Sequence, residues 1–180
     1  MAVREVLLYP HPLLKQICEP VADDDAELEQ LIEDLTDTLR SFPGCVGIAA
    51  PQIGCLKRVI VVDASRNRKP VPNRGLTVLI NPEIEMKEGE EIMREGCLSI
   101  PEFTANVKRA KRIRVSMRNR DERVGSGADA LRTGIETADF EARVIQHEMD
   151  HLDGKLFLDR CASLKTDVFR RKRYAGAEQT

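Results

Sequence analysis

Two histidines, His147 and His151, stand four residues apart in the segment ARVIQHEMDHLDG, and Glu148 directly follows the first of them. In a helix, side chains at this spacing share one face, so that both imidazoles can reach one metal ion and the glutamate can act on a water molecule there. Val144 and Phe140 continue the same face and make it apolar. Because an unpaired buried polar group costs about 1–3 kcal/mol, the histidines need partners. The pattern predicts either a metal site or core histidines satisfied by neighbouring protein groups.

A catalytic metal site commonly has three protein ligands and a water molecule, and the downstream sequence offers no convincing third ligand. Phe157 stands where the pattern HExxHxxGxxH requires another histidine, and Glu178 lies in a polar tail. Asp159 precedes Arg160, which favours a surface ion pair. The third ligand should therefore lie upstream. Cys97, in the segment REGCLSIP, is the strongest candidate, because a bound cation stabilises a thiolate.

The composition limits the classes of protein to which the chain can belong. Of its 180 residues, 42% are apolar and 32% are charged, and the net charge is −2. These values predict one globular domain over residues 1–180 and exclude a chain-wide basic field for nucleic acid. No apolar run approaches the length of about 18 residues that a membrane helix needs. An odd number of cysteines, without a CxxC pair or an export signal, favours a reducing cytoplasmic compartment; the five are Cys18, Cys45, Cys55, Cys97 and Cys161.

Hydrophobic spacing predicts an N-terminal helix followed by strands. Leucine and isoleucine recur at helical intervals between Asp25 and Pro43, and Pro43 with Gly44 should end the helix. The segment 121–133 is polar and contains glycine, which is typical of a hairpin or surface loop. Apolar, β-branched or alternating runs predict strands within 57–65, 76–86, 90–101 and 111–120.

The histidine-bearing helix should begin with Thr137 or Asp139 as its N-cap and end at Gly154. Residues from about 164 to 180 should form a C-terminal helix that frays into a tail. The expected fold is therefore α+β, with mixed or antiparallel sheets packed around a central HExxH-bearing helix, and with an N-terminal and a C-terminal helix.

Three separated motifs resemble those of the peptide deformylases. They are CVGIAAPQIG at 45–54, EGCLSIP at 95–101 and QHEMDHLDG at 146–154, and they occur in that family's order and approximate spacing. The resemblance extends from Tyr9 to about Arg160. It implies a cytoplasmic enzyme, expected to be a monomer, that hydrolyses the formyl group from N-formylmethionine at the start of nascent polypeptides and releases formate.

The resemblance also implies a role for each site residue. Glu148 would act as general base and then general acid toward a metal-bound water or hydroxide, while the Gln52 amide and the Leu98 backbone N–H would face the oxyanion. The metal would be Fe(II), with Zn or Ni able to replace it, although cysteine and histidine ligands by themselves suit zinc at least as well. The implied ligands are Cys97, His147 and His151.

Substrate contacts are expected on two of the motifs. Gly47 would pair with the main chain of the peptide, and Val46 and Val144 would form walls for the methionine side chain. Met93 and Phe140 are further candidates for these walls. For the apolar residues, an ordinary place in the core is the alternative interpretation.

The chain departs from the family pattern at three places. Cys45 replaces the first glycine of the GxGxAAPQ motif, which adds a side chain beside the active-site loop. Thr104 stands about where many members carry an arginine, so that substrate anchoring or the support of Glu95 could differ. The loop at 118–133 is longer than is usual in the family.

Two other functions compete with metal-dependent deformylation. In a cysteine hydrolase, Cys97 would attack directly with His147 as its base, although such an enzyme has no need of Glu148 or the second histidine. A non-catalytic, deformylase-like module that binds metal or the ribosome is the third possibility. The resemblance also implies ribosome docking through a basic C-terminal segment, here Arg170 to Arg173, for which a solvated face is the ordinary interpretation.

Overall fold

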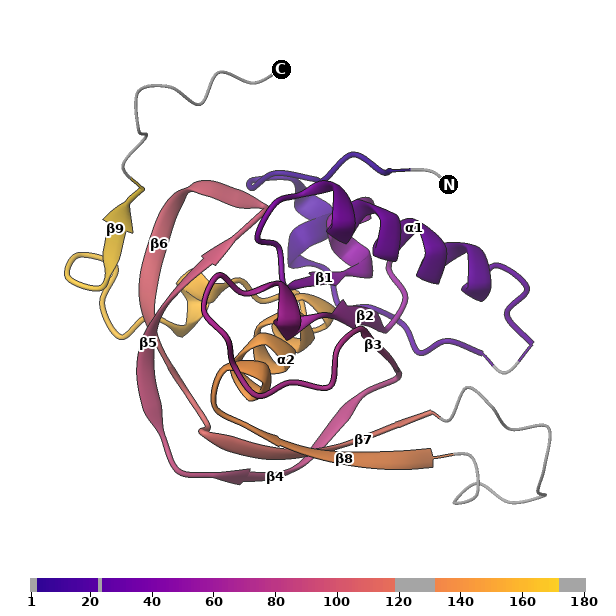
Figure 1. Cartoon of the computed structure of the whole chain (residues 1–180). Coiled ribbons are helices and arrows are strands. Elements are labelled where there is room, and N and C mark those ends of the chain that lie inside the picture. The colour runs from indigo at the N-terminus through magenta and orange to yellow at the C-terminus, as the bar shows by residue number, and fades with distance from the viewer. Residues whose placement is uncertain (1–2, 23, 119–131, 172–180) are drawn as a thin grey trace.

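The computed structural model describes residues 3–22, 24–118 and 132–171, which form an α+β fold (Figure 1). These ranges contain two α-helices, α1 (Leu28–Ser41) and α2 (Asp139–Leu152), and none of their helices is long and apolar enough to cross a membrane. Their strands pair in three antiparallel sheets: β1 (Gly47–Ala49), β2 (Val59–Val62) and β3 (Thr77–Ile80); β4 (Glu83–Glu88), β7 (Arg112–Arg118) and β8 (Arg132–Ala138); β5 (Glu91–Cys97), β6 (Ile100–Arg109) and β9 (Val168–Arg170). Short 3₁₀ helices lie at Pro12–Lys15, Ala50–Ile53, Ala64–Arg66 and Phe157–Arg160.

The sheet β1–β2–β3 is covered by a helix on each face. Ile60 and Val62 of β2 pack in the cluster that contains α2, whereas Val59 and Val61 pack in the cluster that contains α1. Because successive side chains of a strand point to opposite faces, a strand between two helices must be apolar at every position. The buried strand predicted within 57–65 is therefore confirmed.

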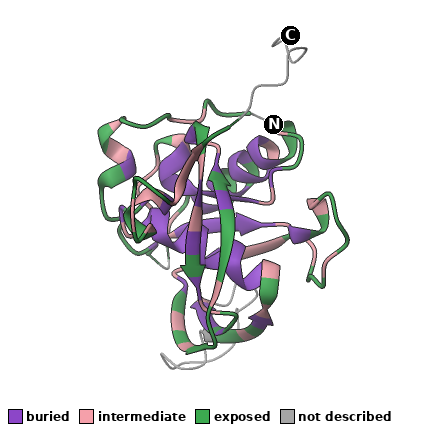
Figure 2. Cartoon of the chain, turned by 90° about the vertical axis from the view of Figure 1, so that its left-hand side faces the viewer, coloured by how far each residue is buried: buried purple, intermediate pink, exposed green. Residues whose placement is uncertain are grey.

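Helix α2 is buried along almost its whole length, from Glu141 to Leu152, and packs against β1, β2, β7 and β8 (Figure 2). Its end is as predicted: the helix stops just before Gly154, whose φ of 65° suits glycine at this position. Its start differs slightly. Ala138 occupies the N-cap, and the Thr137 hydroxyl instead donates a hydrogen bond to the Glu141 carboxylate, 2.7 Å away.

One predicted strand and one predicted loop differ from the structure. The run at 76–86 forms two strands of different sheets, β3 and β4, because Asn81 turns the chain with a φ of 49° and Pro82 follows it. The Asn81 side chain fixes this turn through hydrogen bonds with both backbone groups of Val21. The predicted loop at 121–133 connects β7 to β8, which pair as a hairpin, but Thr133 already belongs to β8. Residues 119–131 lie outside the described residues.

The predicted C-terminal helix is wrong over residues 168–170, which form strand β9 against β6. Val168 and Phe169 are β-branched and aromatic residues, which suit a strand, and the adjacent edge of β6 offers backbone groups that a helix would leave unpaired. A turn held by Asp167, whose backbone N–H and carboxylate both bind Ser163, directs the chain onto that edge. The rest of the predicted helix, from residue 172 onward, lies outside the described residues.

Candidate metal centre

The structure brings Cys97, His147 and His151 together in the interior, where one candidate ligand atom from each residue lies within 4.8 Å of the others. The Cys97 sulfur is 3.3 Å from Nε2 of His151, and the two imidazole ring centres are 5.2 Å apart. All three residues are buried. These residues, named here the candidate metal centre, come from the end of β5 and from one face of α2.

Local structure explains how Cys97 reaches the helix. Strands β5 and β6 form a tight hairpin in which Cys97 pairs with Ile100, and the strand register shifts between Gly96 and Cys97. Such an irregularity bends a strand and redirects the side chain beside it. Cys97 thereby faces α2, whose i and i+4 positions present both histidines on the same side.

The Glu95 carboxylate binds the His147 ring on the side that faces away from the candidate metal centre. Its Oε2 lies 2.8 Å from Nδ1 of His147, so that Nε2 of the ring faces the candidate metal centre. Arg109 binds both carboxylate oxygens at 2.9 Å, and Arg143 donates to Oε1 at 2.8 Å. Burial tends to raise the pKa of Glu95, but the hydrogen bonds from His147 and Arg109 outweigh it and hold the pKa well below the ordinary range. A carboxylate in this position is the usual outer partner of a metal-binding histidine.

The role of Glu95 in orienting His147 was not predicted from the sequence, although its position relative to Cys97 could have indicated it. Glu95 precedes Cys97 by two residues and therefore faces the same side of a strand. Thr104, the departure that raised a doubt about Glu95, is not needed to support the carboxylate, because Arg109 and Arg143 hold it.

A second buried carboxylate, that of Asp150, extends this ion-pair network along α2. Arg109 also contacts Asp150, and Arg160 binds the same carboxylate from the other side. The predicted surface pair between Asp159 and Arg160 is therefore wrong: Asp159 pairs with Lys15 at 2.6 Å and accepts the Leu156 N–H. Sequence proximity favoured the neighbouring residue, whereas the fold brings Asp150 closer to the arginine.

The chemistry of the three side chains suits a divalent transition metal. Burial tends to raise the pKa of the Cys97 thiol, but His151 and His147 lower it well below the ordinary value, which favours the thiolate that a metal requires. Oε2 of Glu148 is buried and has no hydrogen-bond partner among the described residues. Because orphaned buried polar atoms are rare, this oxygen indicates that a bound group completes the site.

Glu148 lies beside the candidate metal centre and against Gly47 of β1. Burial raises the pKa of Glu148 to about 7, although the charges of His147 and His151 oppose that shift. A carboxyl group with a pKa near neutrality can both accept and deliver a proton at physiological pH. Gly47 leaves the space that this side chain fills, since a Cβ there would lie 2.6 Å from Oε1 of Glu148 and 2.8 Å from Val144.

Replacing Gly47 with alanine is therefore expected to displace Glu148 and to reduce turnover by about tenfold to a hundredfold, as misplacement of a reacting group by about 1 Å commonly does. The measurement is kcat for formate release, with bound metal quantified in parallel. Gly134→Ala on β8 is the matched control, because its added Cβ would come no closer than 3.8 Å to the Val115 carbonyl oxygen. Unchanged turnover in Gly47→Ala would show that Glu148 has no need of this space.

Gln52 presents its amide nitrogen to the candidate metal centre. Its Oε1 accepts the Ala49 N–H at 2.9 Å, which directs Nε2 toward Ser99 at 3.1 Å and the Cys97 sulfur at 3.5 Å. Leu98 follows Cys97 in the hairpin turn and lines the same cavity. Both residues therefore line the cavity beside the candidate metal centre.

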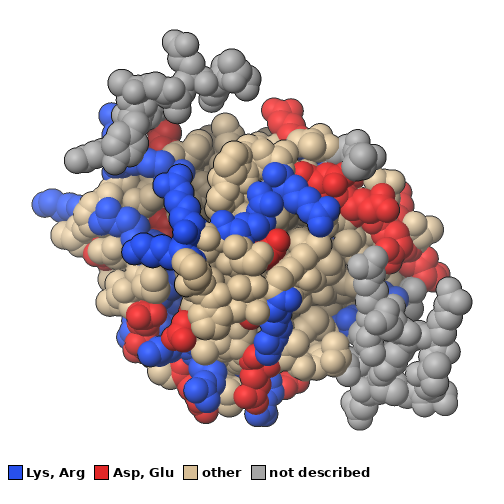
Figure 3. Space-filling view, in the orientation of Figure 1, with Lys and Arg blue, Asp and Glu red and all other residues tan. Residues whose placement is uncertain are grey.

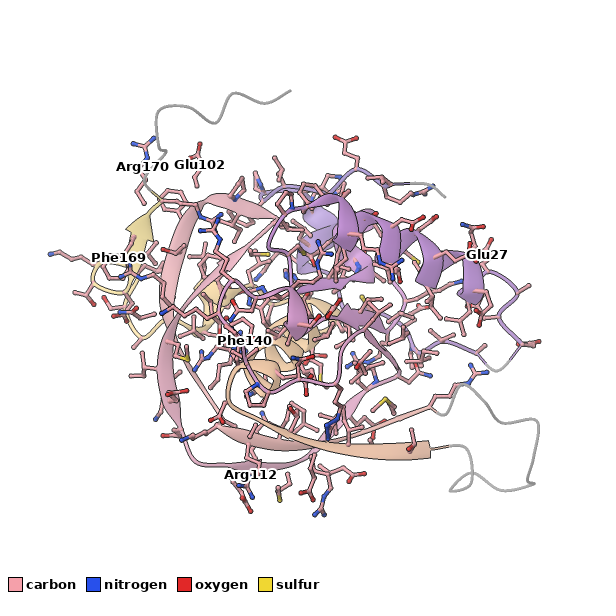
Figure 4. The ribbon with its side chains drawn as sticks, in the orientation of Figure 1. Glu27, Glu102, Arg112, Phe140, Phe169 and Arg170 are labelled. Atoms are coloured by element: carbon pink, nitrogen blue, oxygen red, sulfur yellow. The ribbon has the colours of Figure 1, made fainter. Side chains whose placement is uncertain are left out.

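A cavity of about 730 Å³ opens onto the candidate metal centre. Val46, Gly47 and Val144, the residues expected to contact substrate, all line it, as does Phe140 at the start of α2 (Figure 4). Met93 is not among its lining residues and is 38% exposed on β5.

Cys45, the departure in the first motif, also lines this cavity. Burial raises the pKa of its thiol to about 12, so the group stays protonated at neutral pH. The thiol donates to the Gly47 carbonyl oxygen, 3.1 Å away, within its own loop.

Comparisons with known proteins identify the family. The model of the polypeptide deformylase family matches residues 3–167. The peptide deformylase of Thermodesulfovibrio yellowstonii is 41% identical over 172 residues, which cover 96% of this chain and 97% of that protein. A peptide deformylase crystal structure from Legionella pneumophila has a TM-score of 0.77 and 36% identity, covering 91% of this chain and 89% of that one. A Met-Ala-Ser-bound crystal structure of the Acinetobacter baumannii enzyme has a TM-score of 0.77 and 34% identity, covering 89% of this chain and 100% of that one.

The match covers all three sequence motifs and both elements that form the candidate metal centre. The chain therefore belongs to the polypeptide deformylase family, hydrolytic enzymes that remove the formyl group from nascent polypeptides.

Proposed function

We propose that this chain is a single catalytic domain that binds one divalent metal ion through Cys97, His147 and His151, and that it uses Glu148 to move protons during deformylation. The observation that carries the proposal is the convergence of three candidate ligand atoms within 4.8 Å, directly beside a buried carboxyl group. Fe(II) is the proposed native metal from family resemblance, and Zn or Ni can take its place because the same ligand types suit all three.

When bound, the ion would act as a Lewis acid that lowers the pKa of water and polarises the formyl oxygen. The side chains of the chain perform the remaining tasks. Glu148 accepts the proton of the attacking water through its unpartnered Oε2 and later delivers a proton to the leaving amine of the methionine. Because Glu148 is packed between Gly47 and the two histidines, it reaches both positions with little movement.

Gln52 stabilises the negative charge that develops on the formyl oxygen. Its Oε1 is fixed by the Ala49 N–H, so Nε2 is already oriented before the substrate arrives. The Leu98 backbone N–H is the proposed second donor. Loss of one such donor typically costs about 2.7–4 kcal/mol of transition-state stabilisation.

The cavity next to the candidate metal centre is the proposed binding site for formyl-methionine and the residues that follow it. Val46 and Val144 would contact the methionine side chain, and Gly47 would pair with the peptide main chain. A tripeptide, Met-Ala-Ser, is bound in the related Acinetobacter baumannii structure. The close packing of Gly47 against Val144 and Glu148 is the proposed reason why the site would accept a formyl hydrogen and disfavour an additional methyl group.

The same proposal includes a central position of α2 in the fold, a cytoplasmic location, a monomeric state and docking on the ribosome. They rest on family resemblance, and α2 is further supported by its burial between sheets. Of the basic segment 170–173, Arg170 ends β9 and Arg171 follows it, while residues 172 and 173 lie outside the described residues.

Metal removal tests the proposal against its main competitor, a cysteine hydrolase in which Cys97 is the nucleophile. The lowered pKa of the Cys97 thiol is the observation that favours this second function. We expect a chelator to abolish formate release from formyl-Met-Ala-Ser, and anaerobic addition of Fe(II), or of Ni(II), to restore it. Elemental analysis should give one ion per chain. Activity that survives complete metal loss but is destroyed by iodoacetamide would instead establish the thiol enzyme.

A further inference from the structure

One face of the sheet β5–β6–β9 carries a cluster of residues beside the cavity. Gly96 of β5 pairs with Thr104 of β6, which in turn pairs with Phe169 of β9, so these three residues lie in one row across the sheet. Arg94, two residues before Gly96, has its guanidinium 3.7 Å from the centre of the Phe169 ring. Arg171, two residues after Phe169, belongs to the same face because side chains alternate along a strand.

The Arg171 guanidinium lies directly over Gly96. A Cβ on Gly96 would lie 3.5 Å from Cζ of Arg171 and would overlap its Nη2, so a larger residue here would require the guanidinium to shift. The Arg171 backbone N–H donates to the Glu102 carbonyl oxygen at 2.7 Å, which continues the pairing of β9 with β6 and fixes the position of the residue. Arg171, Gly96 and Cys97 line the same cavity, so the guanidinium borders the cavity that opens onto the candidate metal centre.

Among the described residues, the charge of Arg171 is not balanced by an ion pair. No described carboxylate lies within ion-pair distance of the Arg94 or Arg171 guanidinium, and both residues line the cavity that opens onto the candidate metal centre. Figure 3 shows Lys and Arg side chains gathered on this side of the molecule. A guanidinium is always charged and binds carboxylates well, so the ligand that this geometry selects is a carboxylate.

We propose that Arg171 anchors the substrate by binding a carboxylate on the second or third residue after formyl-methionine. This inference rests on the proposed function, because it places the formyl group at the candidate metal centre. An extended peptide advances roughly 3.3 Å per residue, so its second or third residue after formyl-methionine can reach another part of the same cavity, which the guanidinium lines. The carboxylate is either the C-terminus of a short peptide or an acidic side chain of a longer one.

The test compares Arg171→Gln with wild type on formyl-Met-Ala-Ser and on its C-terminal amide, using metal-loaded enzyme. We expect kcat/KM for the free acid to fall by about tenfold, mainly through KM, because a charge-assisted hydrogen bond is lost. Hydrolysis of the amide should change little. Arg112→Gln, on β7 and distant from β9 (Figure 4), is the control for the loss of one positive charge.

A third substrate identifies the source of the carboxylate. In formyl-Met-Ala-Glu-Ala amide the only carboxylate is a side chain, so its sensitivity to Arg171→Gln assigns the site to acidic residues, whereas sensitivity of the free acid alone assigns it to the C-terminus. Equal losses on acid and amide would mean that Arg171 merely supports β9, and would overturn the anchoring role.

Rescue and direct binding separate anchoring from a structural effect. Thr104 faces Gly96 in the sheet register, and its Cγ2 would lie 3.4 Å from a Cβ there, so Thr104→Arg should return a guanidinium to the same place and restore the acid preference of Arg171→Gln. Calorimetry with the product Met-Ala-Ser should show about tenfold weaker binding to Arg171→Gln, and no such loss with its amide. If wild-type enzyme with metal released no formate from any peptide, the proposed function would fail, while the binding measurement would still test Arg171.

Discussion

Replacing Glu148 with glutamine is expected to lower kcat for formate release by at least about a hundredfold while one metal ion per chain remains bound. General acid–base catalysis contributes typically about 10²–10⁴-fold, and glutamine retains the size of the side chain without its ability to take a proton. The packing against Gly47 and Val144 should therefore persist in the variant. Steady-state kinetics with formyl-Met-Ala-Ser and elemental analysis of the same preparation are the two measurements.

Asp139→Asn is the matched control for Glu148→Gln. It makes the same carboxylate-to-amide change on the same helix, but at an exposed first-turn position with a φ of 55°, which asparagine tolerates. Its turnover should equal that of wild type. A Glu148→Gln enzyme that retained wild-type kcat with full metal content would remove the general base from the mechanism.

Replacing Glu95 with glutamine is expected to lower the free energy of unfolding by about 3–5 kcal/mol, because breaking a buried ion pair leaves an uncompensated charge. Arg109 would keep Asp150 as its partner, whereas the Arg143 guanidinium would lose its only described carboxylate. His147 would also lose the acceptor that orients its ring, and loss of such a partner commonly weakens metal affinity by about tenfold to a hundredfold. Urea denaturation and competition with a chelating dye measure the two effects.

The stability difference should depend on pH in a defined direction. The pKa of Glu95 is held below its ordinary value of 4.5 in the folded chain, so the native state favours the carboxylate, and its contribution is complete above the unfolded pKa. The contribution is lost as the pH falls from about 4.5 through the lower native pKa, so wild type and Glu95→Gln should converge in acid.

The control for Glu95→Gln is Glu136→Gln on β8. Glu136 pairs with Arg114, but their side chains are 51% and 49% exposed, and a surface pair of this kind contributes less than about 1 kcal/mol. A loss at Glu95 no larger than the loss at Glu136 would contradict the structural importance of the buried carboxylate.

Several elements could be predicted from local signals in the amino-acid sequence. Helical spacing identified α1 and placed His147 and His151 on one face, the all-apolar run identified β2, and Gly154 marked the end of α2. These signals can be read without knowledge of the fold because periodicity and capping depend on residues a few positions apart. Cys97 was found by the requirement for a third ligand, since two histidines on an apolar face needed a further partner.

Contacts between groups far apart in the sequence could not be predicted in this way, because they depend on how the chain folds. Residues 168–170 became a strand rather than a helix because the edge of β6, more than sixty positions earlier in the sequence, offered unpaired backbone groups. The same pairing carries Arg171 to Gly96, a contact that no local pattern encodes. Likewise Arg160 binds Asp150 instead of the adjacent Asp159. Side-chain partners of this kind depend on how sheets and helix pack in three dimensions, whereas sequence spacing constrains only neighbours on one element.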